Sequence, residues 1–154
     1  MNKTCLMIIA ALVLLVAGGA YKFLVQGSVV ESADGRIAIS LTAGERDLVL
    51  GEMRAFLVSI QQITKGVTEE NMELVAESAR KVGMGAQRDV PGSLMGKLPL
   101  SFKKLGFDTH SRFDQLALDA ESLGDGQHAL KQLTELMQNC IACHAGHRFE
   151  VSEK

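Results

Sequence analysis

The residues best suited to chemistry lie close to the end of the chain. Cys140, Cys143 and His144 stand in the stretch "NCIACHAGHRFE", and the order C-x-x-C-H is the attachment sequence for c-type haem. Two cysteines three positions apart on a helix lie on one side of it, where they can form thioethers to the two vinyl groups of a porphyrin. The histidine that follows lies on the same face and can bind the iron. The motif therefore predicts one covalently bound haem c, with His144 as the proximal iron ligand.

Two other chemistries use the same residue types. A zinc ion needs about four ligands, which Cys140, Cys143, His144 and His147 could supply. A C-x-x-C pair also serves in disulfide exchange, although usually at a helix start in a thioredoxin-like βαβ unit. A haem-free interaction domain that holds zinc or cycles as a dithiol is therefore an alternative. No acid–base pair or nucleophile constellation stands out beside the motif, so an electron carrier is expected rather than an enzyme.

The first 27 residues are predicted to be a membrane anchor or a signal peptide. Residues 5–20 carry no charge, Lys3 precedes them, and Cys5 fits there as a small apolar side chain. With Tyr21, Lys22 and Phe23 at the interface, the run reaches the roughly 20 residues needed to span a bilayer. Small residues at 18–20 allow the alternative of a cleaved signal. Either way, the rest of the chain is expected in the periplasm, and the uncleaved anchor would hold it at the inner membrane.

Composition favours a single helical domain after this segment. The chain has 154 residues, no tryptophan, one tyrosine, two prolines and a net charge of −2. Its acids and bases are interspersed, which argues against a nucleic-acid surface. Residues 28–41 have the composition of a linker, in which "RIAIS" predicts one short strand. Residues 42–150 are predicted to form the domain.

The pattern of apolar residues predicts helices throughout this domain. Thr42 and Glu45 have capping-box spacing at the start of the first helix, which is expected to end at Gly66. Its apolar stripe recurs at alternating steps of four and three, and it comprises Val49, Met53, Phe56, Ile60, Ile63 and Val67, widened by Leu50 and Leu57. Thr68 is expected to open a second helix that stops at residues 83–85.

Two further long helices complete the prediction. After the connection that holds both prolines, "LSFKKLGF" is expected to be a short helix, and Thr109 is expected to cap the next one. The last helix is predicted over residues 128–149. Four amphipathic helices with short or moderate connections indicate an all-α, antiparallel four-helix bundle that carries the C-x-x-C-H motif on its last helix.

A helical bundle with this motif on its last helix resembles the cytochrome c′ family, including low-spin relatives in which a methionine on the first helix is the sixth iron ligand. The resemblance covers residues 41–149 and is carried by "ERDLVLGEMRAFL", "GMGA" and "CIACHAGHR". Arg148 stands four residues past the histidine, as a basic residue does in the family. His147 stands where the family usually has an aromatic residue. The resemblance implies a monohaem cytochrome in which pairs of helices can form a homodimer.

The resemblance leaves two candidates for the distal side of the iron. Met53, in "EMRAF", is similar to the methionine ligand of the low-spin relatives, and such an iron suits one-electron transfer. Counted from Arg46, the distal position falls on Leu50, which cannot coordinate and would leave a five-coordinate iron open to nitric oxide or carbon monoxide. A histidine ligand is a third option. Met53 is the preferred ligand, and Leu50, Leu57 and Arg148 are expected haem contacts.

The remaining histidines and lysines are expected at the surface. His110 and His128 are predicted to face solvent, and Lys103 and Lys104 to help dock an acidic redox partner. The expected partners are redox proteins of the membrane or periplasm, the inner membrane itself, and a second copy of the chain. The sequence thus predicts a membrane-anchored, periplasmic electron carrier.

Overall fold

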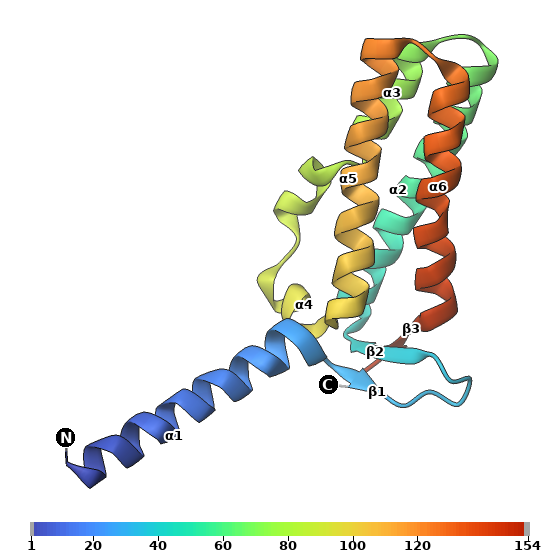
Figure 1. Cartoon of the computed structure of the whole chain (residues 1–154). Helices are drawn as coiled ribbons and strands as arrows, with labels where there is room; N and C mark the ends of the chain where they lie inside the picture. Colours follow the sequence, from blue (N-terminus) through green and yellow to red (C-terminus); the bar gives the residue numbers. More distant parts are fainter. Residues whose placement is uncertain (1, 153–154) are drawn as a thin grey trace.

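The structure is a computed structural model, and it describes residues 2–152. It begins with a long apolar helix, α1 (Lys3–Ala20), which continues as the π-helical segment η1 (Tyr21–Gln26). No residue of α1 is buried, and the helix extends away from the rest of the molecule (Figure 1). By length and composition, the segment Lys3–Gln26 is able to cross a membrane.

Four helices form a bundle beyond this segment: α2 (Ala43–Thr68), α3 (Met72–Arg80), α5 (Leu100–Leu123) and α6 (Gly126–Gly146). Their directions alternate (Figure 1), and each contacts its neighbours in the ring α2, α3, α5, α6. The residues between them form the larger of two apolar cores, which excludes water from one side of every helix. That core comprises Ile63, Val75, Ala76, Ala79, Val82, Phe113, Leu116, Ala117, Ala120, Ala129, Leu133 and Leu136.

The ends of the first two bundle helices are set by side-chain caps. Thr42 accepts a hydrogen bond from the backbone N–H of Glu45, and the Glu45 carboxylate accepts one from the backbone N–H of Thr42, which confirms the predicted capping box. The prediction that Thr68 opens a helix is wrong, because Thr68 is the last residue of α2. Asn71 caps α3 instead, since its side-chain oxygen accepts from the N–H of Leu74 at 3.0 Å.

Helix α5 is one continuous helix where the sequence predicted two. Thr109 lies in its middle and does not cap anything: its hydroxyl donates to the carbonyl of Leu105 at 2.7 Å, the i−4 bond that a threonine inside a helix makes. The chain reaches α5 through a 3₁₀ helix, η2 (Met84–Asp89), and a short helix, α4 (Gly92–Lys97). This connection lies beside the bundle (Figure 1).

A three-stranded sheet closes the lower end of the bundle, so the all-α prediction is incomplete. Strand β2 (Ile37–Leu41), which matches the predicted strand, pairs antiparallel with β1 (Val29–Val30) and parallel with β3 (His147–Val151). The prediction that the last helix runs to residue 149 is wrong, since α6 ends at Gly146 and the chain becomes extended. The segment expected to be a linker, residues 28–41, therefore contributes two strands to the domain.

The sheet rests on a second apolar core. Ile39 and Leu41 of β2 pack with Val49 of α2, with Leu94 and Leu98 of the connection, and with Phe102 of α5. Met53, Met95, Cys143 and Phe149 are partly buried against this cluster. The candidate site is lined by residues of this second core and by Phe56 and Ile60, which pack against the first.

Candidate haem site

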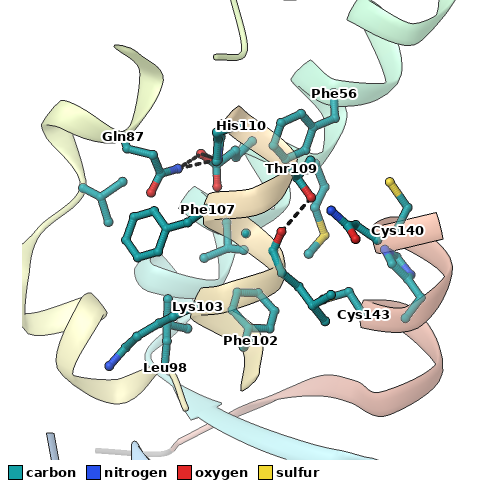
Figure 2. Close-up of a pocket in the computed structure, with 18 of the residues that line it drawn as sticks. Phe56, Gln87, Leu98, Phe102, Lys103, Phe107, Thr109, His110, Cys140 and Cys143 are labelled. Carbon is teal, nitrogen blue, oxygen red and sulfur yellow. Dashed lines mark hydrogen bonds and ion pairs between the residues drawn. The ribbon is translucent and has the colours of Figure 1, made fainter. Parts of the chain in front are cut away.

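A cavity of about 410 Å³ opens beside the C-x-x-C-H motif. It is bounded by α2, by the connection of η2 and α4, by α5 and by α6, and Figure 2 shows side chains approaching from each of them. Most of the lining is apolar. Leu57, Phe107 and Met137 are 68%, 40% and 40% exposed at its edges, so the cavity opens to the surface.

The structure brings five of the predicted site residues to this cavity. Cys140, Cys143 and His144 line it from α6, and Met53 and Leu57 line it from α2. The residues on α6 follow those on α2 by about 80 positions or more in the chain, and the contact between α2 and α6 brings the two groups together. Both ends of the predicted site, the attachment motif and the preferred distal ligand, therefore share one cavity.

Two other predicted contacts lie elsewhere. Leu50 is not among the lining residues, whereas its neighbour Val49 is, because successive residues point about 100° apart around a helix. Arg148 lies on β3, where its guanidinium is 3.2 Å from the Ser32 hydroxyl and 3.6 Å from the Asp34 carboxylate. The helix ends before Arg148, so this side chain does not follow His144 on the same helical face and instead holds the loop between β1 and β2.

The two motif cysteines are free thiols, and both are partly buried. Burial raises the pKa of the Cys140 thiol. Burial, together with the nearby Cys140, raises the pKa of Cys143 to about 11. Disulfide exchange requires a thiolate, which exchange enzymes obtain by lowering a cysteine pKa. The surroundings of Cys140 and Cys143 raise the pKa of both thiols, so they do not favour the dithiol alternative.

His147 ties the end of α6 to the start of α5. It is 9% exposed, its Nδ1 lies 3.3 Å from the carbonyl of Cys143, and its Nε2 lies 3.0 Å from the Ser101 hydroxyl. Its ring also meets Phe102 edge-on at 5.6 Å. Both ring nitrogens thus have protein partners. Within residues 2–152, no three histidine, cysteine or acidic side chains gather as a metal-binding group, so the zinc alternative receives no support from the geometry.

The prediction that His110 faces solvent is wrong. The residue is 1% exposed, and its Nδ1 lies 2.7 Å from the carbonyl of Val82. Its Nε2 is 2.6 Å from the side-chain nitrogen of Gln87 and 3.3 Å from the Glu52 carboxylate (Figure 2). Position 110 points inward because α5 is continuous there and does not begin at residue 109. His110, Gln87 and Glu52 all line the cavity and form one polar cluster in its wall.

The protonation of His110 should make the stability of the protein depend on pH. Burial lowers the pKa of His110, but hydrogen bonds to Glu52 and to the Val82 carbonyl outweigh it and raise the pKa above 6.5. The unfolded chain has the ordinary value, so the stabilisation is complete below about pH 6.5 and is lost as pH rises through the folded-state pKa. We expect the free energy of unfolding, measured by urea titration, to fall across this window.

The His110→Gln variant tests this assignment, because it removes the titrating group and keeps a polar side chain. Its unfolding free energy should be lower at acidic pH and should lose the decline above about pH 6.5. His128→Gln, a change near the start of α6, is the control and should keep the decline. An unchanged pH profile in His110→Gln would mean that another group is responsible.

Several residues that line the cavity were not predicted from the sequence. Met95 of α4 and Met137 of α6 line the cavity, as do Phe102 and Phe107 of α5. Met137 stands three residues before Cys140, so its helical spacing was a usable signal. No sequence signal indicated Met95, because only the path of the connection between α3 and α5 brings it to the cavity.

The volume, the apolar lining and the reactive groups of the cavity make it a candidate haem site. Its volume lies in the range of small-molecule and cofactor sites, which are mostly apolar with a few polar groups. Two free thiols and one imidazole line it from a single helix, and a thioether sulfur lines it from α2. No protein-family model, no curated protein and no solved structure matches this chain.

Proposed function

We propose that the chain is a membrane-anchored, periplasmic, monohaem c-type cytochrome that carries one electron at a time. The observation that carries the proposal is the apolar cavity that Cys140, Cys143 and His144 line from α6 and Met53 lines from the neighbouring helix α2. The bound haem supplies the one-electron redox couple. Cys140 and Cys143 would hold it covalently, and His144 would be its proximal ligand.

Met53 is our choice for the distal ligand over an open site under Leu50. Met53 lines the cavity and packs against the same core cluster as Cys143, whereas Leu50 does not line the cavity. A methionine–histidine pair raises the reduction potential of a haem, as in electron-carrying cytochromes. The apolar surroundings would limit water near the iron, which also tunes its potential.

The uncleaved anchor is the form of the N-terminus that we propose. The backbone stays helical through residues 18–20, where a signal would be cut, and on to Gln26. The helix end is also bonded to the domain, since the Lys103 ammonium donates to the carbonyl of Phe23 at 2.9 Å. Purification from washed membranes followed by N-terminal sequencing tests this part of the proposal, and a start after residue 20 would overturn it.

An optical spectrum of the purified protein tests the function. After expression with the cytochrome maturation machinery, we expect a Soret band that stays with the polypeptide on a denaturing gel. The reduced spectrum should be low-spin and should not change with carbon monoxide. A carbon monoxide-sensitive, high-spin spectrum would favour the gas-binding alternative. A polypeptide without haem would overturn the proposal.

A further inference from the structure

The end of the anchor helix is joined to a wall of the cavity through Lys103. This residue was expected to face a partner, but its ammonium donates to the carbonyls of Phe23 and Leu24, at 2.9 and 3.4 Å. Carbonyls in the last turn of a helix have no partner within it, and a cation is favourable at this end. Burial lowers the pKa of Lys103. Lys103 also lines the cavity, so one side chain links the anchor to the site.

The residues that follow η1 are held in place by close contacts and hydrogen bonds to the domain. Gly27 has a φ of +68°, and a Cβ added there would lie 2.4 Å from the carbonyl oxygen of Lys97, so only glycine fits. The N–H of Ser28 donates to that same carbonyl at 2.7 Å, and its own carbonyl accepts from Ser40 at 2.8 Å. Gly96 of α4 lies against the ring of Phe23. The anchor therefore passes into the domain without a flexible linker.

This junction fixes which side of the domain faces the anchor. Figure 1 shows η2 and α4 on the same side of the bundle as α1, with α6 on the opposite side. The side near the anchor exposes Met84 and Phe107, each 40% exposed, together with Arg88 and the adjacent Asp89. Apolar and basic side chains together are typical of surfaces that lie at the headgroup level of a membrane.

We propose that the anchor holds the domain with residues 84–97 against the phospholipid headgroups, so that the edge of the cavity beside C-x-x-C-H faces water. The inference rests on the anchored form proposed above. A soluble partner in the periplasm would then meet the exposed side chains of Leu57, Met137 and Ile141, which are 68%, 40% and 61% exposed. The fixed junction, and not the anchor alone, gives this orientation.

Photocrosslinking to lipid tests the orientation in the full-length holoprotein, reconstituted in vesicles of phosphatidylcholine and phosphatidylglycerol. The photoreactive residue p-benzoylphenylalanine replaces Met84 in one sample, Leu57 in a second and Leu123 in a third, and lipid adducts are measured by mass spectrometry. Leu57 lies at the far edge of the cavity, and Leu123, 60% exposed, lies at the turn between α5 and α6. We expect adducts at position 84 to exceed those at positions 57 and 123 several-fold.

Loosening the junction should remove this preference. A short glycine–serine insertion between Gln26 and Gly27 leaves every domain residue unchanged and should lower the yield at position 84 to that of the controls. Gly27→Val should do the same. Equal yields at all three positions, or an unchanged yield at position 84 after the insertion, would overturn the inference. The haem spectrum of the same samples reports on the proposed function separately.

Discussion

Replacing both motif cysteines, as Cys140→Ala/Cys143→Ala, should abolish covalent haem attachment. Among residues 2–152, these two half-buried thiols are the only groups at the cavity able to form thioethers to the porphyrin. Haem staining after denaturing electrophoresis should therefore disappear, and the intact mass should equal that of the bare polypeptide. Each single variant should lose most of the stain. Full staining of the double variant would contradict the proposed attachment.

The same double variant should be much less stable than the haem-containing protein. A ligand that binds only the folded state stabilises it, and its loss leaves the cavity walls without contacts. We expect a loss of several kcal/mol in urea unfolding, measured on the purified variants.

Cys5→Ala is the matched control for both measurements. Cys5 is the one cysteine outside the motif. It lies exposed in α1, far along the chain from the residues that line the cavity. Its substitution should change neither the stain nor the unfolding free energy of the domain. Loss of stain in Cys5→Ala would show that attachment does not depend on the C-x-x-C-H motif alone.

Met53→Leu should convert the haem from low-spin to high-spin and open it to carbon monoxide. Leucine has nearly the volume of methionine but no sulfur, so the core should tolerate the change at a cost below about 1.5 kcal/mol. The iron would lose its distal ligand, and its reduction potential should fall. The optical spectrum, carbon monoxide titration and a redox titration together measure this effect.

Met95→Leu and Met137→Leu are the matched controls, because both methionines line the same cavity. Neither should change the spin state if Met53 is the ligand. A spin change in Met95→Leu alone would show that the distal ligand is Met95 on α4 and not Met53. A wild-type protein that already binds carbon monoxide, with no effect of any of the three substitutions, would favour the five-coordinate alternative.

The sequence was sufficient for features that depend on local spacing. The C-x-x-C-H motif, the capping box of Thr42 and Glu45, and the stripe that places Met53 on the inner face of the first helix are all relations within one or two turns. The apolar run at the N-terminus was evident for the same reason, since a helix able to span a membrane requires only length and composition.

Only the tertiary structure decided how these local features meet. Strand β3 forms because β2, more than 100 residues earlier in the chain, offers a free edge to residues that follow a helix, and no local pattern contains that partner. His110 is buried because the turn after α3 supplies Val82 to it and η2 supplies Gln87. The junction of Lys103 with the anchor likewise joins residues 80 positions apart. Contacts between distant segments depend on the packing of the whole chain, and spacing along the sequence does not record them.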